Sequence, residues 1–241
     1  MLRKDRTTVT DIQKLHGYLN YVACVFPFGR PFLAPLTTAI CGLKRSEPVR
    51  ITRAMTACLG IWDAILAANE GLSFNFILGR LPRCPDEIFV DASTEWGIGG
   101  YCGDDYFLFP WTELSVFGAN IIVEKELLAC LIAIFCFSLK VTGKIVRLWS
   151  DNTSTVQWLQ KGRSSNTTGT KYLACWELQK YRLRCKISPR WVPGDMNVTA
   201  DALSRGTIPE WLESRGNKCV CNLDKVAYET SHPELSWRSI V

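Results

Sequence analysis

The pattern of apolar positions changes near residue 86 and divides the chain into two parts. In the first part, apolar residues recur at the three- and four-residue spacing of an amphipathic helix over residues 8–24: Ile12, Leu15, Leu19 and Val22. Thr10 and Gln13 fit a capping box at its start. A second helix is predicted after Pro48, with an apolar face made of Ile51, Met55, Cys58, Trp62 and Ile65. Gly and Pro residues in 71–85 indicate a connection. Residues 1–85 are therefore predicted to form a small, mainly helical segment.

After residue 86, short apolar strands alternate with helices. The predicted strands are residues 87–91, 97–103, 106–111, 144–150 and 183–192, and the predicted helices are residues 124–140, 153–161, 170–181 and 197–205. The order βββαβαβα predicts an antiparallel meander beside parallel strands. We therefore expect an α/β domain over residues 86–206, with a mixed five-stranded sheet and flanking helices. Residues 207–241 form a polar, Trp-containing tail whose pattern defines no structure.

Composition narrows the class of protein only mildly. Apolar residues make up 47% of the chain and charged residues 21%, which is typical of a globular protein. The net charge of +5 permits a polyanionic partner without requiring one. The cysteine count is odd, at 11, and the charged start at residues 2–6 is unlike a secretion signal. We therefore expect a reduced, intracellular protein. The longest apolar run, residues 127–139, is too short to span a bilayer, so no membrane partner is expected.

Four acids occupy positions where a fold of this kind can bring them together. Asp91 and Asp151 end two apolar strands, while Glu126 and Asp201 lie near the starts of two helices. Clustered carboxylates repel one another unless cations neutralise them. Oxygen ligands without nearby His or Cys favour Mg²⁺ or Mn²⁺. Two such ions can clamp an in-line phosphoryl displacement, so the four acids are candidate ligands of a two-metal site.

Each acid also has a simpler interpretation. Asp151 and Asn152 fit a cap of the following helix, Asp201 fits a first-turn acid, and Glu124 competes with Glu126. The sequence Tyr101-Cys-Gly-Asp-Asp105 looks like the Y-x-D-D turn of a polymerase. We interpret it as a hairpin turn, since no fingers or palm sequence precedes it.

Several short blocks resemble the ribonuclease H domain of a retrotransposon polyprotein. These blocks are Val90-Asp-Ala-Ser93 with Gly97-Ile-Gly-Gly100, Glu126-Leu-Leu-Ala129, Ser150-Asp-Asn152 and Asn197-Val-Thr-Ala-Asp-Ala-Leu-Ser-Arg205. The last block is the most specific and is similar to gypsy-type and DIRS-type elements. Residues 15–33 resemble the thumb and connection that follow a reverse transcriptase palm. The resemblance covers residues 8–206 and is strong only in the short blocks.

The resemblance implies a ribonuclease H-like fold and a nuclease that cuts the RNA strand of RNA–DNA hybrids. It makes the four acids the catalytic carboxylates and the ligands of two Mg²⁺ or Mn²⁺ ions: Asp91, Glu126, Asp151 and Asp201. The product would carry a 5′-phosphate, and the polymerase part of the same polyprotein would be the expected partner. The family's histidine follows the glycine after the fifth strand, but here Asp195 follows Gly194. Two alternatives stay open: a non-catalytic nucleic-acid-binding or connection module of a decayed or domesticated element, and another nuclease or transposase of the same fold.

A basic segment supplies candidate contacts with nucleic acid. Residues 161–190 hold eight Lys and Arg residues with Trp158, Trp176 and Trp191 interleaved or adjacent. The charges fit either a basic handle on backbone phosphates or a solvated helix face, and we favour the core for the Trp residues. Gly99 and Gly100 either let the backbone approach the RNA 2′-hydroxyls or relieve a bulge. The candidate nucleic-acid-binding residues are Gly99, Gly100, Asn152, Lys161, Arg163 and Lys171.

Overall fold

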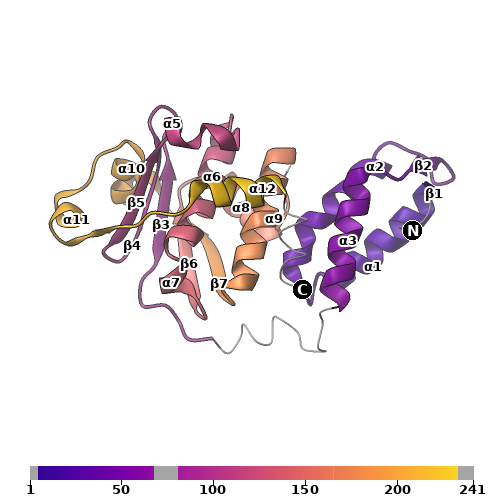
Figure 1. Cartoon of the computed structure of the whole chain (residues 1–241), viewed down its shortest axis with the longest axis horizontal. Coiled ribbons are helices and arrows are strands. Elements are labelled where there is room, and N and C mark those ends of the chain that lie inside the picture. Colours follow the sequence, from indigo (N-terminus) through magenta and orange to yellow (C-terminus); the bar gives the residue numbers. More distant parts are fainter. Residues whose placement is uncertain (1–4, 68–80, 165, 233–241) are drawn as a thin grey trace.

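Residues 5–67 form the first of two units in the computed structural model, which describes residues 5–67, 81–164 and 166–232 (Figure 1). Its elements are β1 (Arg6–Thr8), α1 (Val9–Val22), the 3-10 helix η1 (Pro27–Leu33), α2 (Ala34–Ile40), β2 (Pro48–Arg50) and α3 (Arg53–Ala67). Strands β1 and β2 pair antiparallel. The two predicted helices are present as α1 and α3. The predicted connection at 71–85 lies mostly outside the described residues.

Helix α1 begins at a different cap from the one predicted. Thr8 is the N-cap, and its side chain accepts a hydrogen bond from the backbone N–H of Asp11. The predicted capping box of Thr10 and Gln13 is wrong. The reason is that β1 runs directly into the helix, and the Thr10 hydroxyl donates instead to the carbonyl oxygen of Arg45 at 2.9 Å.

The second unit is an α/β unit built on one mixed sheet of six strands. The strands are β3 (Ile88–Ala92), β4 (Gly97–Cys102), β5 (Asp105–Pro110), β6 (Ile145–Ser150), β7 (Lys186–Trp191) and β8 (Asn217–Lys218). Their order across the sheet is β7-β6-β3-β4-β5-β8. The β3-β4-β5 meander is antiparallel, and β6, β7 and β8 pair in parallel with their neighbours. The prediction of five strands is therefore wrong by one, because the two-residue strand β8 carries no apolar alternation.

Helices cover the sheet on both faces. They are α5 (Trp111–Leu114), α6 (Ile122–Cys136), α7 (Ser138–Val141), α8 (Thr153–Lys161), α9 (Thr167–Arg182), α10 (Val198–Ser204), α11 (Glu210–Arg215) and α12 (Leu223–Ser231), with 3-10 turns η2 (Ser115–Phe117) and η3 (Gly194–Met196). The single helix predicted at 124–140 is divided at Phe137, which leaves helical geometry between α6 and α7. The segment of residues 101–105, which looks like a polymerase Y-x-D-D turn in the sequence, contains the turn between β4 and β5, with Gly103 at a φ of 62°.

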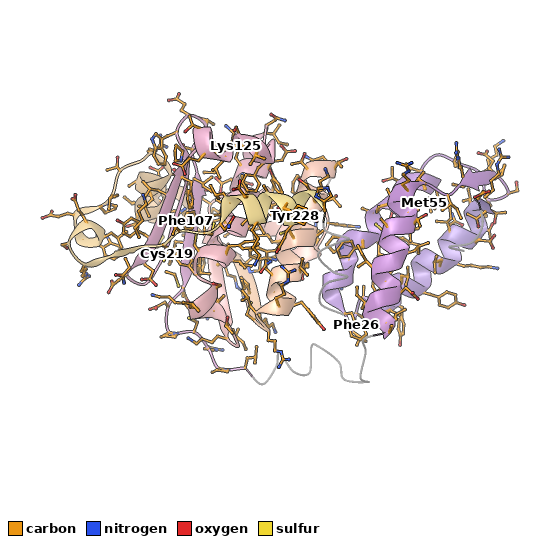
Figure 2. All side chains as sticks on the ribbon, viewed as in Figure 1. Phe26, Met55, Phe107, Lys125, Cys219 and Tyr228 are labelled. Carbon is orange, nitrogen blue, oxygen red and sulfur yellow. The ribbon has the colours of Figure 1, made fainter. Side chains whose placement is uncertain are left out.

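Helix α6 fills the centre of the main hydrophobic core. Every residue from Glu126 to Ile134 is buried, and the core extends to Val226 and Ala227 of α12. Residues 207–232, whose structure the sequence pattern left open, thus contribute α12 to this core and Leu212 of α11 to a smaller cluster on the other face of the sheet. Figures 1 and 2 show α10 and α11 on the side of the sheet away from α6, with Phe107 inside the second unit.

The two units pack against each other through α9. Ala174 and Leu178 of this helix belong to the same buried cluster as Ile12, Met55 and Trp62 of the first unit. In the described parts of the chain, no helix is both long and apolar enough to cross a membrane.

Candidate metal centre

Three of the four predicted acids meet at one edge of the sheet. One carboxylate oxygen from each of Asp91, Glu126 and Asp151 lies within 4.8 Å of the other two. Strands β3 and β6 are parallel neighbours with Ile88 aligned to Leu148, each three residues before an acid. Asp91 and Asp151 therefore reach the same sheet edge. Glu126 joins them from the buried side of α6, near the start of that helix.

Hydrogen bonds fix the oxygens of this group. The Ser204 hydroxyl lies 2.5 Å from Oδ2 of Asp91, and the Ser150 hydroxyl lies 3.3 Å from Oε2 of Glu126. The backbone N–H of Ala92 also donates to the Glu126 carboxylate. Because hydroxyl and amide donors stabilise charged carboxylates, these contacts favour an anionic, oriented set of oxygens.

Burial and mutual repulsion oppose that charge. Removal from water raises the pKa of Asp91 to about 6, and the neighbouring charges of Asp151 and Asp201 add to the increase. Burial raises the pKa of Glu126 well above its ordinary value, with further increases from Asp91 and Asp151. The pKa of Asp151 is also raised, first by burial and then by Asp201. A bound cation relieves this kind of conflict, since it compensates the buried negative charge.

The fourth acid, Asp201, lies beside the three carboxylates and outside their close group. Its side chain is 43% exposed, and its Oδ1 accepts hydrogen bonds from both Nε and Nη2 of Arg205, at 2.9 and 2.8 Å. The charge of Asp201 nevertheless reaches Asp91 and Asp151, because it raises the pKa of both. The structure therefore brings three of the predicted acids into one close group and places the fourth at its rim.

Two polar residues near the acids, Glu124 and Asn152, each cap a helix. Glu124 caps α6, because its Oε2 accepts the backbone N–H groups of Asn120 and Ile121 at 2.8 and 3.3 Å. Glu126, not Glu124, thus belongs to the acid group. Asn152 caps α8, with its Oδ1 accepting the N–H of Thr155 at 3.0 Å. A contact between Asn152 and nucleic acid stays a prediction.

Two further residues lie near the acids: Asn197, to which the sequence pattern assigned no role, and Trp191, for which it favoured the core. Asn197 is buried, and its Nδ2 donates to the carbonyl oxygen of Val90 at 2.9 Å, which ties α10 to the strand that carries Asp91. Among the described residues its Oδ1 has no hydrogen-bond partner. Trp191 is 50% exposed, and its Nε1 donates to the carbonyl oxygen of Asp151 at 3.0 Å. The signals available in the sequence were the first position of the N-x-x-A-D block and the end of the fifth predicted strand.

The predicted nucleic-acid-binding residues fall into two kinds. Lys161, Arg163 and Lys171 are exposed around the α8–α9 connection, and their contact with nucleic acid stays a prediction. Gly99 and Gly100 are buried. A Cβ on Gly99 would lie 2.5 Å from Leu203 and Ser204, so this glycine lets α10 approach β4. Contact of the two glycines with nucleic acid stays a prediction, beside this packing role.

The three Trp residues of the basic segment differ in exposure. Trp176 is buried in the main core and Trp158 is partly buried against it. The preference for the core is wrong for Trp191, because its position at the end of the edge strand β7 leaves half of the ring in solvent.

The residues of this site fit a hard divalent cation. The group offers only oxygen ligands from three carboxylates, and none of its members is committed to an Arg or Lys ion pair in the described parts of the chain. Searches of known proteins supply no further guide, because no family model and no curated protein matches the chain.

Proposed function

We propose that this chain is a divalent-metal-dependent nuclease of the ribonuclease H class, which hydrolyses the RNA strand of an RNA–DNA hybrid. The observation that carries the proposal is the close, buried group of Asp91, Glu126 and Asp151 at the edge of a mixed sheet. The mixed sheet, with its meander beside parallel strands, supports assignment to a ribonuclease H-like fold. The blocks around Asp91 and Asp201 that resemble that class support it further.

The protein side of the chemistry consists of holding and orienting oxygens. Asp91, Glu126 and Asp151 would bind two Mg²⁺ or Mn²⁺ ions, which when bound supply an activated water and neutralise the charge that develops on the leaving oxygen. The hydroxyl of Ser204 orients the Asp91 carboxylate, and the hydroxyl of Ser150 orients that of Glu126. Both hydrogen bonds favour the ionised form of the carboxylate. Asp201 adds negative charge at the rim, and Arg205 holds its Oδ1. No basic side chain needs to remove the proton of water in this scheme.

Charge and exposed surface support a nucleic-acid substrate. Lys161 ends α8, the helix that starts next to Asp151, and Arg163 and Lys171 follow it; all three are exposed. Trp191 offers a half-exposed ring whose indole nitrogen is held at the Asp151 carbonyl. Basic side chains grip phosphates, and aromatic rings pack against bases or sugars. The choice of an RNA–DNA hybrid comes from the resemblance, as does the polymerase part of the same polyprotein as partner. We place the reaction inside the cell, in keeping with the odd number of cysteines, 11.

The direct test is cleavage of an end-labelled RNA–DNA hybrid by the full chain with Mg²⁺. We expect cuts in the RNA strand, products with 5′-phosphates, and little cleavage of the matching DNA duplex. Asp151→Asn keeps the shape of the side chain and removes its charge, so its rate should fall by about 100-fold or more, the order of several kcal/mol that a catalytic metal supplies. Asp224→Asn, at an exposed acid of α12, is the matched control and should leave the rate unchanged.

Two outcomes would overturn the proposal. Equal cleavage by the wild type and Asp151→Asn would show that the acid group does not carry the reaction. Hybrid binding without any metal-dependent cleavage would favour the second candidate, a non-catalytic nucleic-acid-binding module. Two observations favour that candidate. The fourth acid, Asp201, is paired with Arg205, and Asp195 stands at the position of the family's histidine.

A further inference from the structure

A polar pocket lies where the two units meet, away from the acid group. Its volume is about 320 Å³, and it is lined by Arg30 of η1 together with Gln160, Lys180, Ser188 and Arg190 of the second unit. The junction is tight at this point, because a Cβ on the buried Gly162 would lie 3.3 Å from the Cβ of Arg30. One wall of the pocket, formed by Arg30, is therefore supplied by η1 where it packs on the second unit.

The charges that line this pocket are unbalanced. Lys180 is neutralised by Glu177, at 2.8 Å, and both side chains are largely buried, at 16% and 5% exposed. The side chains of Arg30 and Arg190 form no hydrogen bond or ion pair with any part of the chain that the structure describes. Two guanidinium groups without partners thus border one hollow. Such groups match the oxygens of a phosphate in a planar, bidentate way.

The position of the pocket relates it to the acid group. Helix α8 starts after Asp151 and Asn152, and its last residue, Lys161, is followed by the pocket residue Gly162. Nine residues of α-helix span about 13 Å. One strand of a nucleic-acid duplex rises about 3.4 Å per nucleotide, so this length corresponds to roughly four nucleotides. Arg190 also directly precedes Trp191, whose indole contacts the Asp151 carbonyl.

We propose that this pocket binds a backbone phosphate of the nucleic-acid substrate, with Arg30 and Arg190 as its ligands, a few nucleotides from the bond that is cut. The inference rests on the proposed function for its substrate class. It extends that function because Arg30 comes from η1, so the first unit would also take part in binding the substrate. The two arginines are binding residues and take no part in the hydrolysis.

The test is the salt dependence of hybrid binding by the full chain. A fluorescein-labelled RNA–DNA hybrid is titrated in EDTA, so that binding is measured without cleavage, over about 50 to 200 mM salt. Loss of one phosphate contact should reduce the slope of log K against log salt by about 1. We expect this reduction for Arg30→Gln and for Arg190→Gln, and about twice as much for the double variant. Thermal unfolding of each variant shows whether it is folded.

The matched control is Lys218→Gln. Lys218 is exposed on β8, at the opposite edge of the sheet from β7, and should bind hybrid with the wild-type slope. A second readout separates binding from chemistry: with saturating hybrid and Mg²⁺, Arg30→Gln should cleave at the wild-type rate while its KM rises.

Failure of this inference can be distinguished from failure of the proposed function. Wild-type slopes in both arginine variants, or an equal loss in Lys218→Gln, would overturn the pocket assignment even if the chain cleaves hybrid. A reduced slope in the arginine variants of a chain that never cleaves would support the pocket and overturn the nuclease. No measurable hybrid binding by the folded wild type would overturn both.

Discussion

At the scale of single residues, Ser204 is the clearest example of a side chain that acts through another. Its hydroxyl lies 2.5 Å from Oδ2 of Asp91 and 2.9 Å from the backbone carbonyl oxygen of Asp201, so it connects the Asp91 carboxylate to the backbone of α10. Partners of metal-binding carboxylates fix their orientation. Ser204 is buried, and a substitution at this position changes the site without changing the charge of the chain.

Ser204→Ala should lower Mg²⁺ affinity and hybrid cleavage by about 10- to 100-fold, because Asp91 loses its orienting donor. The rate is measured against Mg²⁺ concentration, and Ser214→Ala, at an exposed serine of α11, is the control. A wild-type Mg²⁺ dependence in Ser204→Ala would contradict the assigned role.

Trp191 is the residue whose exposure differs most from the sequence interpretation. If its ring packs against the substrate, Trp191→Ala should cost about 1–3 kcal/mol of hybrid affinity, the usual value of a stacking contact. Trp191→Phe should retain more of the affinity because it retains a ring, although it loses the donor to the Asp151 carbonyl. Tyr228→Ala, at another exposed aromatic, should bind as the wild type does.

At the scale of elements, the approach of α10 to β4 determines how close Ser204 and Asp201 come to Asp91. Gly99 permits this approach, since its missing Cβ would meet Leu203 and Ser204 at 2.5 Å. Gly99→Ala should therefore push α10 away, reduce the free energy of unfolding by about 1–3 kcal/mol and reduce cleavage at the same time.

The comparison for Gly99→Ala is Gly17→Ala, in the interior of α1. A Cβ on Gly17 meets nothing within 4 Å, and alanine favours helix over glycine, so this variant should gain about 0.5–1 kcal/mol. Urea unfolding measures both. Equal stability of Gly99→Ala and the wild type would show that the contact between α10 and β4 can relax.

The sequence predicted well those helices and strands whose apolar residues recur at a regular spacing. It predicted less well the features that depend on contacts between distant parts of the chain. The apolar runs predicted β3, β6 and α6, and with them the elements that carry Asp91, Asp151 and Glu126. Strand β8 was not predicted because it consists of two polar residues whose pairing with β5 is a contact between distant parts of the sequence. The pairing of Asp201 with Arg205 is an i,i+4 contact, which the spacing within the predicted helix at 197–205 allows. The position of Asp201 beside the other three acids depends instead on long-range packing, which spacing does not give.

At the scale of the whole molecule, buried acids couple metal binding to stability. The folded-state pKa of Asp91, about 6, lies above its ordinary value of 3.8. The folded protein therefore holds this proton more tightly than the unfolded chain does. This stabilisation is complete below pH 3.8 and is lost as the pH rises through about 6.

In EDTA, the free energy of unfolding should fall between about pH 4 and pH 6.5, with roughly 3 kcal/mol of this decrease from Asp91. Mg²⁺ should raise the Tm at pH 7.5 and have little effect at pH 5, because a proton competes with the metal for the carboxylates. Asp91→Asn should flatten the pH dependence of the free energy of unfolding. The same variant should show a smaller rise of the Tm with Mg²⁺. A Tm insensitive to Mg²⁺ at pH 7.5 would argue against a metal site in the free protein.

The proposed reaction depends on one group of three carboxylates, and Glu126 is its most buried member, at 3% exposed. The most direct measurement is the single-turnover rate of hybrid cleavage against Mg²⁺ concentration, for the wild type and Glu126→Gln. The wild-type rate should be zero in EDTA and should rise to saturation with Mg²⁺, while the variant should stay about 100-fold or more below it. Cleavage that persists in EDTA, or the same Mg²⁺ curve for both proteins, would contradict the account.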